Sequence, residues 1–115
     1  MVTIYHNPRC SKSRETLALL QARGIEPEIV RYLETPPDAE TVAILLKKLG
    51  MSSVRQLMRS KEDLYRELDL GRETLSETTL LETLVANPKL LERPIVINGE
   101  YARIGRPPEA VLEIL

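Results

Sequence analysis

The only cysteine and the only histidine of this chain, Cys10 and His6, lie close together near its start. The residues that flank the cysteine are cations and hydroxyls: Arg9, Ser11, Lys12, Ser13 and Arg14. A thiol reacts as its thiolate, and nearby cations and hydrogen-bond donors favour that charged form. The spacing therefore predicts a reactive cysteine with a lowered pKa at Cys10.

The elements around Cys10 place it between a strand and a helix. Val2–Tyr5 is β-branched and aromatic, whereas residues 15–23 have a helical pattern that Gly24 ends. The backbone amides at the start of a helix favour an anion by about 0.3 to 1 kcal/mol, but lowering a thiol pKa by about 2 units takes about 2.7 kcal/mol. The neighbouring cations are therefore expected to supply the remaining free energy that lowers the Cys10 pKa.

A lone cysteine is often no more than a small buried apolar residue. The basic setting of Cys10 at a helix start favours a catalytic role instead. Because the chain has one cysteine, it cannot form an internal disulfide, and any redox cycle needs an external thiol such as glutathione or that of another protein. One cysteine and one histidine are too few for a typical zinc site, so no metal is expected.

Length and charge limit the possible classes of function. The 115 residues suit a single domain over 1–115, and a net charge of -1 predicts no nucleic-acid partner. No apolar run approaches the roughly 20 residues of a membrane span, and the chain opens on a strand rather than a secretion signal. We expect a cytoplasmic protein with no membrane partner.

The second strand is expected within residues 25–33, covered on both faces and parallel to the first. Thr35 is expected to cap the following helix, with Pro36 and Pro37 in its first turn and Gly50 at its end. Asp38 would be its third residue.

Residues 36–91 read as an all-helical insertion, with short helices over 53–58, 60–68 and 76–86. Residues 95–104 then form a hairpin centred on Asn98-Gly99. A closing helix is expected to turn Val111, Leu112 and Leu115 to the sheet. This order predicts an α/β, thioredoxin-like fold with a four-stranded mixed sheet.

Four separated motifs resemble the glutathione/glutaredoxin-dependent arsenate reductases, over about residues 2–115. The motifs are His6-Asn7-Pro8-x-Cys10-x-x-Ser13-Arg14, Tyr32-Leu33-Glu34-Thr35-Pro36-Pro37, Arg93-Pro94-Ile95-Val96 and Arg106-Pro107. The resemblance implies the same thioredoxin-like fold and a cis peptide bond before Pro94, which would stand beside Cys10. The chain ends directly after its closing helix, as expected of a short housekeeping branch of this family.

The resemblance also implies roles for single residues. Arg59, Arg93 and Arg106 match the arginines that hold the arsenic oxyanion, and Arg14 is grouped with these substrate-binding residues. His6 matches the histidine that keeps the thiol ionised, although a hydrogen-bonding role at the strand end is an equal alternative. Ser13 stands where dithiol oxidoreductases have a second cysteine, and its hydroxyl could donate to the thiolate.

The implied activity is reduction of arsenate to arsenite through a Cys10 adduct, with glutathione as co-substrate, glutaredoxin as partner and no bound cofactor. A monothiol enzyme of thiol-disulfide exchange or deglutathionylation is one alternative, which would tolerate loss of Arg59 and Arg106. A regulator that binds RNA polymerase is another, although Ser13 replaces the second cysteine of its usual switch. A polymerase pull-down would identify that regulator.

Overall fold

The computed structural model describes all residues from Met1 to Leu115. The chain forms two compact units, one of Met1–Thr35 with Arg93–Leu115 and the other of Pro36–Glu92. None of its helices has the length and apolar character needed to cross a membrane.

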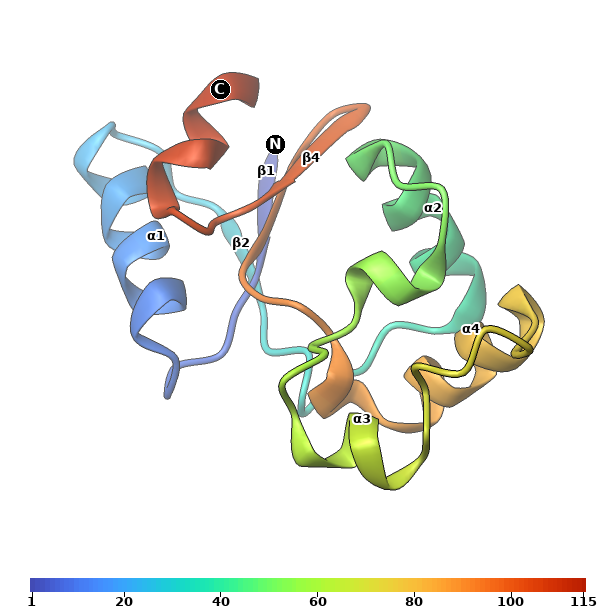
Figure 1. Cartoon of the computed structure of the whole chain (residues 1–115). Helices are drawn as coiled ribbons and strands as arrows, with labels where there is room; N and C mark the ends of the chain where they lie inside the picture. Colours follow the sequence, from blue (N-terminus) through green and yellow to red (C-terminus); the bar gives the residue numbers. More distant parts are fainter. The chain divides into compact units, whose positions relative to one another are not determined.

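The first unit is built on a four-stranded mixed sheet in the order β2-β1-β3-β4 (Figure 1). Its strands are β1 (Val2–Tyr5), β2 (Glu28–Val30), β3 (Ile95–Asn98) and β4 (Tyr101–Ile104). β1 pairs with β2 in parallel, whereas β1 with β3 and β3 with β4 are antiparallel. Together with the helices α1 (Ser11–Ala22) and η3 (Pro108–Ile114), this topology confirms the predicted α/β, thioredoxin-like fold.

The core of this unit joins its two central strands to its two helices. Ile4 of β1, Val96 of β3, Leu20 of α1 and Val111 of η3 are fully buried in one cluster. Helices α1 and η3 lie against each other, as the blue and red ribbons of Figure 1 show. Burial of these aliphatic side chains is the main force that holds α1 against the sheet.

Helix α1 begins at Ser11, four residues before the predicted start at residue 15, and Cys10 is its N-cap. The early part was missed because its inward position, Ser13, is polar. Ser13 and Thr16 are fully buried on the same helix face as Leu20, and hydroxyl residues give no apolar periodicity in the sequence.

Strand β2 is shorter than predicted, and the expectation that it is covered on both faces was wrong. It pairs only with β1 at the edge of the sheet, and the side chain of Ile29 is 44% exposed. Its parallel pairing with β1 is confirmed. Edge strands are commonly short and partly solvated.

The predicted hairpin is present, but its turn lies one residue further on. Asn98 pairs with Tyr101, so the loop residues are Gly99 and Glu100, and Gly99 has a φ of 63°. The closing segment η3 is a 3₁₀ helix rather than an α-helix. Val111 is buried as predicted, whereas Leu115 is exposed.

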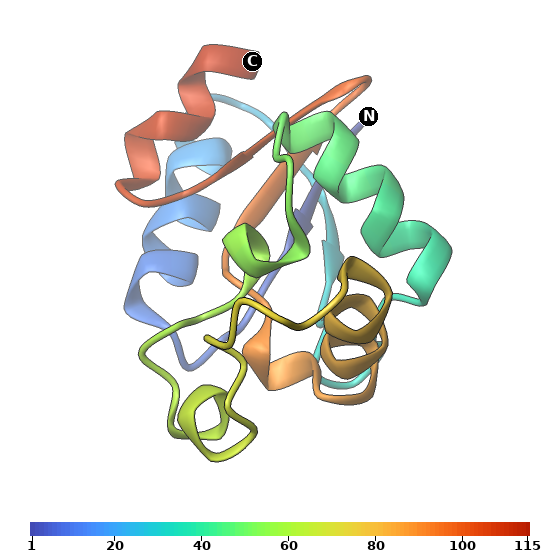
Figure 2. The ribbon, with the colours of Figure 1, turned by 45° about the vertical axis from the view of Figure 1, so that its right-hand side comes forward.

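The second unit is helical. It contains α2 (Ala39–Leu49), η1 (Val54–Leu57), α3 (Asp63–Glu67), α4 (Glu77–Ala86) and η2 (Pro88–Leu90), with one isolated β-bridge between Met58 and Leu91. Helices α2 and α4 pack against each other, as Figure 2 shows.

The start of α2 differs from the prediction. The Asp38 side chain accepts a hydrogen bond of 2.8 Å from the Thr41 amide and caps the helix. Pro36 and Pro37 therefore precede the helix, and Thr35 is not its cap. Gly50 ends α2 in the left-handed region, as predicted. α3 begins at Asp63, later than the predicted residue 60, and is one short turn.

Candidate functional site

Cys10 is half-buried at the end of a tight loop that Asn7 organises. The Cys10 amide donates to the Asn7 carbonyl over 3.0 Å, and the Arg9 amide donates to the Asn7 side-chain oxygen over 3.0 Å. Asn7 had no predicted role of its own, although an Asn-Pro pair is a known turn signal. The loop places the sulfur at the start of α1, where helix amides are available to an anion.

The environment of the sulfur favours the thiolate. Burial is the largest single influence on the Cys10 pKa and raises it, but the Ser13 amide, the Arg93 charge, the Lys12 amide and the Arg106 charge all lower it. The net result is a Cys10 pKa below its ordinary value. The Cys10 pKa is thus lowered, as predicted, and two of the groups that lower it, Arg93 and Arg106, lie far from Cys10 along the chain.

Arg106 makes the direct contact with the nucleophile. Its Nη2 donates a hydrogen bond of 3.5 Å to Cys10 Sγ, while its Nε donates to the Arg93 carbonyl over 2.8 Å. The structure thus brings together Cys10, Arg93 and Arg106, three of the residues selected from sequence. A thiolate beside guanidinium groups is a site that attracts a small anion.

The neighbouring cations of the Cys10 loop do not act as expected. Lys12 Nζ pairs with Glu15 over 3.3 Å. Arg14 donates to the Pro8 carbonyl over 3.0 Å and so supports the loop rather than the sulfur. The expectation that these nearby charges lower the Cys10 pKa is corrected, because Arg93 and Arg106 do so instead.

His6 and Ser13 form a buried pair next to the loop. His6 Nδ1 and Ser13 Oγ lie 2.6 Å apart, and Ser13 Oγ also accepts a hydrogen bond of 3.0 Å from the Asn7 amide. Burial, then the charges of Arg31 and Arg14, lower the pKa of His6 below its ordinary value, so the imidazole is neutral at pH 7.

The contact between His6 and Ser13 changes the role that was predicted for each of them. A neutral His6 gives no positive charge to the thiolate, and its contacts favour the hydrogen-bonding alternative. The Ser13 hydroxyl is engaged with His6 and Asn7, so the expectation that it donates to the sulfur is corrected. The Ser13 amide has that role.

Pro94 and Gly105 lie at the sheet end next to Arg93 and Arg106. The Arg93–Pro94 bond is cis, as the resemblance implied, and so is the Arg106–Pro107 bond. The Gly105 amide donates to the Pro94 carbonyl over 2.9 Å. A Cβ at Gly105 would lie 2.5 Å from Thr16 Oγ1 and 2.8 Å from Pro94 Cγ.

The close contact at Gly105 requires a residue without a side chain, and this requirement was not predicted from the sequence. Only glycine lets the chain pass this close to Thr16 and Pro94 before it reaches Arg106. No spacing or composition signal marks such a contact, because its two partners are distant in sequence.

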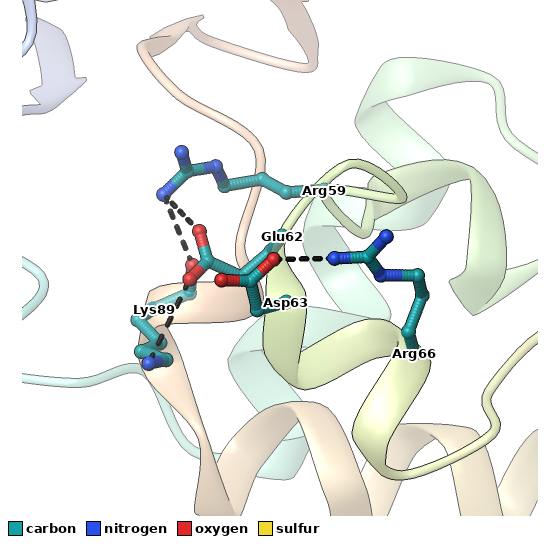
Figure 3. A network of polar contacts seen from close by, with 5 residues as sticks. All are labelled: Arg59, Glu62, Asp63, Arg66 and Lys89. Atoms are coloured by element: carbon teal, nitrogen blue, oxygen red, sulfur yellow. Dashed lines mark hydrogen bonds and ion pairs between the residues drawn. The ribbon is translucent and has the colours of Figure 1, made fainter.

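Arg59 belongs to the second unit, where a network of polar contacts holds it (Figure 3). Its Nη1 lies 3.3 Å from Glu62 and also donates to the Lys89 carbonyl over 3.3 Å. Lys89 Nζ is 3.6 Å from the same carboxylate, and Arg66 pairs with Asp63 nearby. The side chain of Arg59 is thus held in place, and its role with Cys10 stays a prediction.

No group of three or more histidine, cysteine, aspartate or glutamate side chains is close enough to hold a metal ion. The chemistry that the first unit offers is that of one thiolate with guanidinium and amide donors.

We expect the alkylation of Cys10 by iodoacetamide to reach half of its maximal rate at a lower pH than that of free cysteine. The thiolate is the reacting form, so the rate rises as the pH rises through the Cys10 pKa. Arg106→Gln removes one charge that lowers this pKa, so its midpoint should move upward. Arg23→Gln, at the other end of α1, is the matched control. A wild-type midpoint at or above that of free cysteine would contradict the prediction.

Comparison with known proteins gives one consistent result. The family model described as "ArsC family" matches residues 5–114. The chain is 66% identical over 114 residues to the uncharacterized protein YfgD of Escherichia coli K12, covering 99% of this chain and 96% of that protein. It is 54% identical over 114 residues to a protein of Haemophilus influenzae named arsenate reductase, covering 99% and 98%.

A solved structure agrees with these relatives. The structure titled arsenate reductase from Vibrio cholerae matches with a TM-score of 0.97 at 56% identity, covering 99% of this chain and 97% of that one.

Proposed function

Since the chain belongs to the ArsC family, we propose that it is an arsenate reductase that uses Cys10 as nucleophile and glutathione and glutaredoxin as reductants. The observation that carries this proposal is the hydrogen bond from Arg106 to Cys10 Sγ, beside the charge of Arg93. An oxyanion that binds these guanidinium groups is brought to the sulfur by the same contacts.

The arrangement favours an oxyanion substrate over simple disulfide exchange. Thiol-disulfide exchange needs a thiolate but no pair of guanidinium groups beside it. Arsenate carries several oxygens on one centre, and a guanidinium group can donate to two of them at once. The family resemblance adds Arg59, whose guanidinium lies 3.3 Å from Glu62, as a third donor.

The proposed reaction begins with attack of the Cys10 thiolate on arsenic. A sulfur–arsenic bond forms, and one arsenic–oxygen bond breaks as protons carry that oxygen away as water. The amides of Ser13 and Lys12 and the two arginines stabilise the negative charge of the adduct.

Two external thiols complete the cycle, because the chain has no second cysteine. Glutathione displaces a second oxygen as water and forms its own sulfur–arsenic bond. The glutaredoxin thiolate then attacks the glutathione sulfur, and the electron pair of the broken bond reduces arsenic(V) to arsenic(III). Hydrolysis releases arsenite and Cys10, and the mixed disulfide leaves on glutaredoxin. A reducing cytoplasm would supply both thiols.

The test is arsenate-dependent NADPH oxidation in the presence of glutathione, glutaredoxin and glutathione reductase. We expect turnover by the wild type and an arsenate KM raised roughly tenfold to a hundredfold in Arg93→Ala, since one hydrogen bond to a charged group contributes about 1.5 to 3 kcal/mol. Arg23→Ala is the control and should behave as the wild type.

Absence of arsenate-dependent turnover in the wild type would overturn the proposal. In that case, reduction of a glutathione–peptide mixed disulfide would identify a monothiol oxidoreductase. Recovery of RNA polymerase in a pull-down would identify the regulator.

A further inference from the structure

A cavity of about 190 Å³ opens beside the Cys10 loop within the first unit. Its lining residues come from the loop that precedes α1 and from the segment that follows β2: His6, Asn7, Pro8, Arg9, Arg31, Leu33 and Glu34. The cavity has room for about one amino-acid residue. The proposed reaction with arsenate makes no use of it.

The wall of this cavity carries both signs of charge next to apolar surface. Arg31 and Glu34 lie on one turn, in which the Glu34 amide donates to the Arg31 carbonyl over 2.9 Å. Pro8 and Leu33 supply apolar surface, and Leu33 is 45% exposed. A cation and an anion three residues apart on a turn match a ligand that carries a carboxylate and an ammonium on the same carbon atom.

The cavity adjoins the loop that carries the nucleophile. Arg9, which lines it, is bonded in sequence to Cys10, and the Cys10 amide donates to the carbonyl of Asn7, another lining residue. A ligand anchored by Arg31 and Glu34 would therefore lie next to the loop that carries the sulfur.

We propose that this cavity binds the α-amino-acid end of a γ-glutamyl thiol, the class to which glutathione belongs. The guanidinium of Arg31 takes the carboxylate, Glu34 takes the ammonium, and Pro8 and Leu33 pack against the methylene groups. Arg9 adds positive charge on the side nearest Cys10. The inference deepens the proposed function, since it assigns a binding site to the thiol that the proposed function requires.

A second oxyanion site fits this cavity less well. The Glu34 carboxylate would repel arsenate or phosphate, and the apolar surface of Pro8 and Leu33 offers such an ion no donors. An amino-acid head group uses every one of these features.

The test uses a reaction that needs no arsenate. The only cysteine is converted to a mixed disulfide with Ellman's reagent, and the release of the coloured thiol is followed as the added thiol attacks the Cys10 sulfur. Glutathione, γ-glutamylcysteine and 2-mercaptoethanol are compared. The first two share the γ-glutamyl group, and γ-glutamylcysteine lacks glycine.

We expect the rate to saturate with glutathione and with γ-glutamylcysteine but to stay linear with 2-mercaptoethanol. Arg31→Gln and Glu34→Gln should each lower the rate at low concentrations of the two γ-glutamyl thiols about tenfold, which is about 1.4 kcal/mol, and leave that of 2-mercaptoethanol unchanged. Arg23→Gln removes the same charge as Arg31→Gln at the far end of α1 and should have no effect.

An equal loss with all three thiols, or no loss with any, would overturn the inference. Saturation with glutathione but not with γ-glutamylcysteine would also overturn it, because the glycine would then be the recognised end. The outcome is independent of the proposed function. If the wild type turns over arsenate but does not discriminate among the thiols, only the assignment of the cavity is refuted. If it discriminates among the thiols but does not turn over arsenate, only the proposed arsenate reductase activity is refuted.

Discussion

Cys10→Ser is expected to lower arsenate turnover to background, a loss of roughly a thousandfold or more. A serine hydroxyl in the same position is not ionised near neutral pH, and the donors that lower the Cys10 pKa cannot make it so. The coupled NADPH assay measures the loss. Retained turnover would show that the sulfur is not the nucleophile.

The stability of Cys10→Ser provides the control for this result. Cys10 is the N-cap of α1 but makes no side-chain capping hydrogen bond. Serine is among the preferred N-cap residues, and a good cap contributes about 0.5 to 2 kcal/mol. The free energy of unfolding, measured in urea, should therefore stay the same or rise. A variant that loses activity while keeping its stability has lost the chemistry rather than the fold.

Gly105→Ala is expected to lower both the stability and the activity of the protein. The new methyl group would lie within 2.5 Å of Thr16 Oγ1 and 2.8 Å of Pro94 Cγ, so the chain must shift. Overpacking of this kind costs about 1 to 3 kcal/mol. Because Arg106 follows directly and contacts Cys10 Sγ, we expect a shift of about 1 Å to reduce turnover roughly a hundredfold.

Gly71→Ala is the matched control for this substitution. A Cβ at Gly71 would meet only the Tyr65 side chain, at 3.8 Å. Its effect on unfolding should be neutral or stabilising by up to about 1 kcal/mol. Thermal unfolding and the arsenate assay, applied to both variants, measure the difference. Equal behaviour of Gly105→Ala and Gly71→Ala would contradict the close packing.

The strand and helix order could be predicted because the aliphatic residues of the sheet and the turn at Gly99 have strong local signals. The start of α1 could not, since Ser13 and Thr16 are buried hydroxyl residues. They are satisfied by contacts with His6 and Asn7 and with the Lys12 carbonyl, which a sequence pattern does not display.

The residues of the site could be predicted better than the contacts that they make. Cys10 and His6 stand out by composition, and Arg93 and Arg106 were selected through the family resemblance. The identity of the donors that act on the sulfur was not predictable. Lys12 and Arg14 are closer to Cys10 in sequence than Arg106 is, but the side chain of Lys12 pairs with Glu15 and that of Arg14 donates to the Pro8 carbonyl. Proximity along the chain is a poor guide to electrostatics when a sheet joins its distant ends.

The contact between Cys10 and Arg106 has a consequence during synthesis of the protein. The cysteine leaves the ribosome well before its guanidinium partners, because Arg93 and Arg106 lie 83 (93 - 10) and 96 (106 - 10) residues after Cys10. A nascent chain therefore carries a thiol without these two charges, less ionised and less prone to oxidation than that of the finished protein. Full reactivity arises only when β3 has paired with β1 and β4 with β3.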